Sequence, residues 1–93
     1  MAMTHPIHDP RNQRIAALLA SIRAQRGLLQ EEVAARLKRP QSFVSKYESG
    51  MRRVDLAELL DILGALEADP HDFIDQIQAA PIKTLPRQFR SRS

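Results

Sequence analysis

The sequence contains no cysteine and no tryptophan, and its only aromatic residues are three phenylalanines and one tyrosine. Without cysteine, neither a disulfide framework nor a thiolate metal site can form, which is compatible with a reducing cytoplasm. No apolar run approaches the roughly 20 residues that span a bilayer, and the N-terminus lacks the charged-then-apolar plan of a signal peptide. We therefore expect a cytoplasmic protein with no membrane partner.

Length and composition predict one small domain. Ninety-three residues, of which 43% are hydrophobic, can bury a modest core but leave little room for a separate catalytic cleft. His5 and His8 have a possible metal spacing, but they lie in a proline-flanked terminus with no fourth donor nearby. The carboxylates of residues 55–75 lack a partner base, a nucleophile or a glycine-rich loop. We expect no enzyme, no catalytic residue, no metal and no cofactor.

Charge is distributed unevenly along the chain, although the net charge is only +3. Residues 36–53 carry six cations against one anion, whereas residues 54–78 carry seven anions and no lysine or arginine. After Pro81 the chain is basic again. A polyanion would therefore be attracted to the middle and the end of the chain and repelled between them, although a charge run is also an ordinary solvated surface.

Local signals predict five helices and no strand. Asp9-Pro10 is a helix start, and the apolar stripe Ile15, Leu18, Leu19 and Ile22 predicts a helix over about 10–26, ending at Gly27. A second helix is expected over 30–37, where Leu29 is a poor N-cap. Pro40 forces a turn near 38–40, and a third helix then runs from Gln41 to its end at Gly50.

Two further helices are expected in the acidic part of the chain. Residues 55–58, Asp-Leu-Ala-Glu, have the form of a capping box, and they open a helix with an apolar face before Gly64. The residues of that face are Leu56, Leu59, Leu60 and Leu63. Asp69-Pro70 starts the fifth helix, whose buried face is predicted to be Phe73, Ile74 and Ile77. This organisation predicts an N-terminal arm over 1–9, a helical domain over 10–78 and a flexible basic tail over 79–93.

The third helix has two different faces. Phe43, Val44 and Tyr47 recur at helical spacing, while the other residues of the helix share a polar and cationic face. Two short helices joined by about three residues, the second with such a face, form a helix-turn-helix arrangement. In this arrangement the polar side chains suit the base edges of the major groove of double-stranded DNA. The predicted base-contacting residues are Gln41, Ser42, Ser45 and Lys46.

Residues from about 14 to 75 resemble the lambda-repressor-like (XRE) helix-turn-helix domain. The resemblance rests on IRAQRGLLQEEVAARL at 22–37, FVSKYESG at 43–50 and LAELLDILGAL at 56–66. This sequence departs from the family pattern in the turn between the second and third helices. There, Lys38 stands in place of a glycine and Pro40 in place of a small or polar cap residue. A left-handed Lys38 costs about 1 kcal/mol relative to glycine, so a differently shaped turn is one alternative.

The resemblance implies an all-α, five-helix DNA-binding domain and a role for several side chains. It makes Arg23 and Glu48 a structural ion pair, and Gln30 a phosphate-binding residue at the start of the second helix. The further predicted phosphate contacts are Arg39, Ser49, Arg52 and Arg53. Two roles are compatible with Phe43, because it can anchor the third helix in the core or pack against thymine methyl groups.

Proteins with three different functions use this domain, and the sequence favours the first of them. The first is a transcriptional regulator, most simply a repressor, that binds an inverted-repeat operator as a homodimer. The second is the antitoxin of a toxin–antitoxin pair, with the tail IKTLPRQFRSRS binding a protein partner, and the third is a protein-interaction module that has lost DNA binding. The predicted dimer interface is Phe73, Ile74 and Ile77, unless these residues complete the monomer core.

Overall fold

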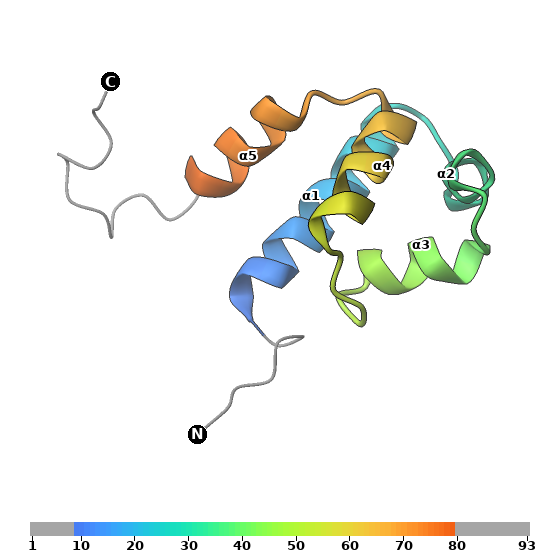
Figure 1. Cartoon of the computed structure of the whole chain (residues 1–93), viewed down its shortest axis with the longest axis horizontal. Coiled ribbons are helices and arrows are strands. Elements are labelled where there is room, and N and C mark those ends of the chain that lie inside the picture. The colour runs from blue at the N-terminus through green and yellow to red at the C-terminus, as the bar shows by residue number, and fades with distance from the viewer. Residues whose placement is uncertain (1–8, 80–93) are drawn as a thin grey trace, which may run out of the picture.

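The structure is a computed structural model of the chain, and it describes residues 9–79. Over these residues Figure 1 shows five helices and no strand. They are α1 (Pro10–Gln25), α2 (Gln30–Leu37), α3 (Gln41–Glu48), α4 (Leu56–Leu66) and α5 (Pro70–Ala79). The predicted all-α, five-helix class is therefore confirmed. The predictions for His5, for His8 and for the basic tail beyond Ala79 concern residues outside the described range.

The helix starts follow the predicted capping chemistry. The Asp9 carboxylate accepts the backbone N–H of Arg11 at 2.8 Å, and Pro10 is the first helical residue. The pKa of Asp9 is lowered from 3.8 to about 2. The main cause is the hydrogen bond from the Arg11 guanidinium, and the second is the hydrogen bond from the Arg11 backbone N–H. In α2, Leu29 contributes no side-chain cap, but Glu32 Oε1 accepts the Leu29 backbone N–H at 2.7 Å. The carboxylate of Glu32 thus satisfies one of the open donors at this terminus.

The first four helices end in the same hydrogen-bonded turn. In each, one residue adopts a left-handed conformation, and the N–H of the next residue bonds a carbonyl five residues earlier, as in a Schellman motif. The left-handed residues are Gly27, Lys38, Gly50 and Glu67. Lys38 has φ 58° and ψ 42°, so the turn between α2 and α3 keeps the shape that a glycine would give it. The alternative of a differently shaped turn is not observed.

The predicted apolar face of α4 is confirmed at Leu59 and Leu63 and wrong at Leu56 and Leu60. The helix continues through Gly64 to Leu66, and Leu56 and Leu60 are 68% and 48% exposed. The buried residues are Leu59, Ile62, Leu63 and Leu66. A glycine inside a helix lowers its stability without ending it, so the apolar stripe could extend to Leu66. The buried stripe therefore lies three residues further along the helix than predicted, and it leaves out Leu56 and Leu60.

The core draws on all five helices. Its fully or nearly buried members are Leu19, Val33, Ala34, Phe43, Val44, Tyr47, Leu59, Ile62, Leu63, Leu66 and Phe73. Phe73 is only 1% exposed, whereas Ile74 on the same helix is 43% exposed. The predicted buried face of α5 is therefore confirmed at Phe73 and wrong at Ile74. In Figure 1, α3 lies at the lower right of the domain, and it packs against α2 and α1.

Candidate nucleic-acid interface

The two faces of α3 separate as the sequence predicts. Phe43, Val44 and Tyr47 are buried between 0% and 8% exposure. The polar side chains between them are exposed, and they are Gln41, Ser42, Ser45 and Lys46. Because the apolar face is embedded in the core, the polar face is presented on a helix that is fixed to the rest of the domain.

Phe43 belongs to the core. It is 8% exposed, and its ring meets that of Tyr47 edge to face, with centroids 5.4 Å apart and planes at 75°. Such edge-to-face pairs add stability beyond the area they bury. Burial raises the pKa of Tyr47 well above its ordinary value, and the neighbouring Glu48 contributes in the same direction. The hydroxyl of Tyr47 therefore stays protonated. Because the ring of Phe43 is packed in the core, it is not available to contact thymine methyl groups.

Arg23 of α1 and Glu48 of α3 are bonded through two parallel contacts. Arg23 Nε lies 2.6 Å from Glu48 Oε2, and Nη2 lies 3.0 Å from Oε1. Arg23 Nη1 also donates to the carbonyl oxygen of Leu28 at 2.8 Å. The two side chains are 19% and 7% exposed. A bidentate pair with this burial ties the end of α3 to α1 and leaves little of either charge to solvent.

Gln30 extends this ion pair to the start of α3. Its side-chain amide donates to Glu48 Oε1 at 2.9 Å, and its oxygen accepts the Gln41 amide at 2.7 Å. The chain of bonds therefore runs from Arg23 through Glu48 and Gln30 to Gln41. Sequence reasoning assigned Gln30 to phosphate alone and did not anticipate this link. The link leaves one N–H of the Gln30 amide for another acceptor.

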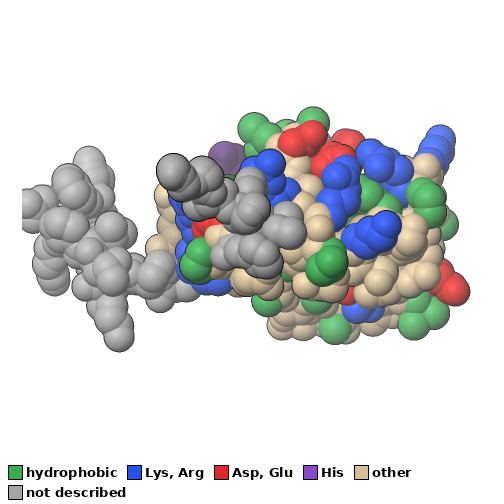
Figure 2. All heavy atoms as spheres, turned by 90° about the horizontal axis from the view of Figure 1, so that it is seen from below, with side chains coloured by type: hydrophobic (Ala, Val, Ile, Leu, Met, Phe, Trp, Pro, Cys, Tyr) green, Lys and Arg blue, Asp and Glu red, His purple; other side chains and the backbone are tan. Residues whose placement is uncertain are grey.

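Apart from Gln30, the side chains predicted to contact phosphates lie at the two ends of α3. Arg39 and Arg52 are 44% and 37% exposed, and Arg53 is exposed in the loop before α4. Ser49 donates its hydroxyl hydrogen to the carbonyl oxygen of Lys46 at 3.0 Å. Figure 2, which views the molecule from the α3 side, shows several lysine and arginine side chains gathered on this face. These groups produce a positive potential beside the polar face of α3.

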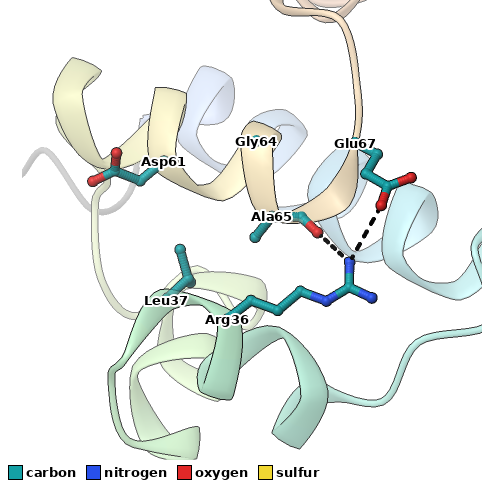
Figure 3. Close-up of a pocket in the computed structure, with 6 residues that line it drawn as sticks. All are labelled: Arg36, Leu37, Asp61, Gly64, Ala65 and Glu67. Atoms are coloured by element: carbon teal, nitrogen blue, oxygen red, sulfur yellow. Dashed lines mark hydrogen bonds and ion pairs between the residues drawn. The ribbon is translucent and has the colours of Figure 1, made fainter.

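Not every cation of the basic stretch faces α3. Arg36 donates to the carbonyl oxygen of Ala65 at 2.6 Å and lies 4.0 Å from the Glu67 carboxylate, as Figure 3 shows. Arg26 donates to the backbone carbonyl of Glu67 at 2.5 Å. Both arginines thus neutralise the carbonyl-rich end of α4, where positive charge is favoured. The sequence contained no local signal for these contacts, because they join residues 29 and 41 positions apart.

The clefts between α2 and α4 and between α1 and α5 are lined mainly by polar atoms. The groove in Figure 3, of about 500 Å³, is lined by Arg36, Leu37, Asp61, Gly64, Ala65 and Glu67. Within residues 9–79 there is no group of three or more histidine, aspartate or glutamate side chains placed to hold a metal ion. None of the helices in that range is both long and apolar enough to cross a membrane.

Comparisons with known proteins agree with this geometry. A family model described as a helix-turn-helix domain matches residues 14–73. An XRE-family like protein from Pseudomonas syringae pv. tomato str. DC3000 is 42% identical, with a TM-score of 0.73, and the match covers 80% of this chain and 90% of that one. A comparison with curated proteins found no match.

More distant solved structures share the fold. The restriction-modification controller protein C.Esp1396I, solved as a tetramer with its natural 35 base-pair operator, is 20% identical over 73% of this chain and 90% of that one, with a TM-score of 0.69. The clp gene regulator ClgR from C. glutamicum is 24% identical over 75% of this chain and 90% of its own, also with a TM-score of 0.69. The family model and the Pseudomonas relative show that the chain belongs to the XRE family of helix-turn-helix DNA-binding proteins.

Proposed function

We propose that the chain is a sequence-specific repressor that binds an inverted-repeat operator through α3. The observation that carries this proposal is the exposed polar face of α3 on a helix whose other face is buried. A glutamine amide can pair with adenine, a lysine can donate to guanine, and serine can serve either base. Gln41 and Ser42 lie at the amino-terminal end of α3, where a recognition helix contacts bases, and Ser45 and Lys46 lie one turn later.

The proposed phosphate contacts surround this face. Gln30 is the first residue of α2, where free backbone N–H groups favour an anion. Arg39 precedes α3, and Ser49, Arg52 and Arg53 follow it. Such contacts hold a protein in register on the duplex while the base contacts supply the sequence preference.

Selection of binding sites from a random duplex library tests the proposal. We expect a preferred inverted repeat whose half-sites lie about one helical turn, roughly 34 Å, apart. Affinity for the selected site should fall steeply with salt, because binding releases counterions from several phosphates. A library that yields no preferred sequence, or an affinity that does not change with salt, would contradict the proposed function. A reporter gene placed behind the selected site then distinguishes repression from activation.

A homodimer is the second part of the proposal. One helix-turn-helix reads only a few base pairs, so two copies are needed to read an inverted repeat. Phe73 is withdrawn from the predicted interface because it lies in the core, which leaves Ile74 and the half-buried Ile77 on α5. Ile77 lines an apolar groove of about 300 Å³ with Leu18 and Ala17 of α1. This groove and Ile74 form the proposed contact between protomers.

Sedimentation of the protein with a selected inverted repeat tests the dimer. We expect two protomers per duplex, and we expect Ile77→Asp to weaken this assembly because it introduces a charge into the groove. Gln78→Asp is the matched control, since it adds the same charge at an exposed neighbouring position of α5. One protomer per duplex at saturation, or equal effects of the two substitutions in folded protein, would remove the dimer from the proposal.

A further inference from the structure

Arg39 and Arg52 flank α3 in the sequence, yet their guanidinium groups meet at one carboxylate. Arg39 lies two residues before the first residue of α3, and Arg52 lies four after its last. Arg52 Nη2 bonds Glu58 Oε2, and Arg39 Nη2 lies 3.5 Å from the same oxygen. Both flanks of α3 are therefore attached to a single side chain of α4.

Phe43 provides a second surface that the two arginines share. The central guanidinium carbon lies 4.3 Å from the centre of the Phe43 ring for Arg39 and 4.9 Å for Arg52. A cation within about 6 Å of a ring centre is attracted to its electron-rich face. Each guanidinium is thus restrained by a ring and a carboxylate. Because each carries five N–H donors and remains partly exposed, donors that do not face Glu58 are left for another anion.

The Glu58 carboxylate is itself held in place. It is 16% exposed, and its Oε1 accepts the backbone N–H of Asp55 at 3.1 Å. Asp55 Oδ1 in turn accepts the backbone N–H of Glu58 at 2.7 Å, which completes the capping box of α4. Moving the carboxylate away from the arginines would break this cap. The position of the two guanidinium groups is therefore set by the start of α4.

We infer that Glu58 is a positioning residue for DNA recognition, which orients Arg39 and Arg52 beside α3 and offsets one of their two charges. The inference rests on the proposed DNA binding. Two guanidinium groups held in fixed positions contact a phosphate well only when α3 lies in the major groove in the orientation of the specific complex. Sequence-independent attraction instead grows with the number of charges that neutralise phosphates, and Glu58 reduces that number. Glu58 therefore increases the preference for the operator over other DNA.

Glu58→Gln tests this role, because it removes the charge but keeps an oxygen that can accept the Asp55 N–H. Glu67→Gln is the matched control: it makes the same change at the opposite end of α4, where the carboxylate lies 4.0 Å from Arg36 (Figure 3). Affinity is measured for the selected site and for a random duplex over a range of salt. In Glu58→Gln, the log–log salt slope on random DNA should steepen by about 0.9, and the ratio of selected-site to random affinity should fall about threefold. Glu67→Gln should change neither.

A charge-balanced variant covers the case in which Glu58→Gln alone does not fold. Arg39→Gln combined with Glu58→Gln restores the net charge of the cluster, so the salt slope should return to that of the original protein. The affinity ratio should stay low, because the remaining arginine has lost its carboxylate. The inference is overturned if Glu58→Gln changes both affinities by one factor, if Glu67→Gln matches it, or if the double variant recovers the ratio. A failure of the original protein to prefer any duplex would instead overturn the proposed function and the inference with it.

Discussion

Gln41 donates its side-chain amide to Gln30 Oε1 across 2.7 Å, so the first residue of α3 is bonded to the first residue of α2. Gln30 is held in turn by Glu48, which is paired with Arg23. The orientation of the Gln41 amide is therefore set within the protein before any ligand arrives. Side chains that are ordered in advance lose less entropy on binding, which favours their use in recognition.

Removing either partner of the Arg23–Glu48 pair should destabilise the domain strongly. We expect Arg23→Ala and Glu48→Ala each to lower the free energy of unfolding by about 3–5 kcal/mol, because the remaining charge is left partly buried and unpaired. Urea denaturation measures the change. Arg11→Ala is the comparison, since the Arg11–Asp9 pair is exposed and its loss should matter far less. Similar losses for the exposed and the buried pair would contradict the structural role.

Base-contacting and phosphate-contacting residues should give different mutant profiles. Lys46→Ala and Gln41→Ala should each reduce discrimination at one base pair by about 1–3 kcal/mol. Arg53→Ala should weaken all sequences alike and lower the salt slope by about 1. We choose Arg53 because Arg52 also packs on Phe43. Affinity measurements over a library of single-base variants of the selected site separate the two profiles. Indistinguishable profiles would refute the assignment of base and phosphate roles.

The orientation of α4 can be checked with a pair of leucines. Leu63 is 1% exposed and Leu60 is 48% exposed. Leu63→Ala should therefore lower the stability by about 2–5 kcal/mol, since it leaves a cavity in the core. Leu60→Ala should cost less than about 1 kcal/mol, because half of its side chain is already in water. Thermal or urea denaturation distinguishes the two, and a loss for Leu60→Ala as large as that for Leu63→Ala would support the apolar face predicted from the sequence, which contained both leucines.

Lys38→Gly should stabilise the turn between α2 and α3. A left-handed conformation costs a non-glycine residue about 1–2 kcal/mol, and the extra freedom of glycine in the unfolded chain costs about 0.4–1 kcal/mol. The expected net gain is about 0.5–1 kcal/mol. Lys38→Val should instead destabilise the domain, because a β-branched side chain fits φ 58° poorly. Urea denaturation of the two variants gives the order, and a less stable Lys38→Gly would exclude strain at this position.

The sequence by itself determined the positions of the helices and the two faces of α3. Asp9-Pro10 and the capping box at Asp55 mark helix starts, and Gly27 and Gly50 mark helix ends. These signals were readable because capping and left-handed turns depend on residues within a few positions of each other. The alternation of buried and polar residues along α3 is local in the same sense.

The tertiary structure decided which side chains meet. It buried Leu66 instead of Leu60, placed Phe43 in the core, turned Arg36 toward the end of α4 and gathered Arg39 and Arg52 at Glu58. The apolar residues of a helix form a stripe that is wider than the part that becomes buried. Packing against neighbouring helices decides which of these residues are buried. Long arginine side chains reach partners on other helices, so their contacts depend on how the helices pack and not on the residues beside them.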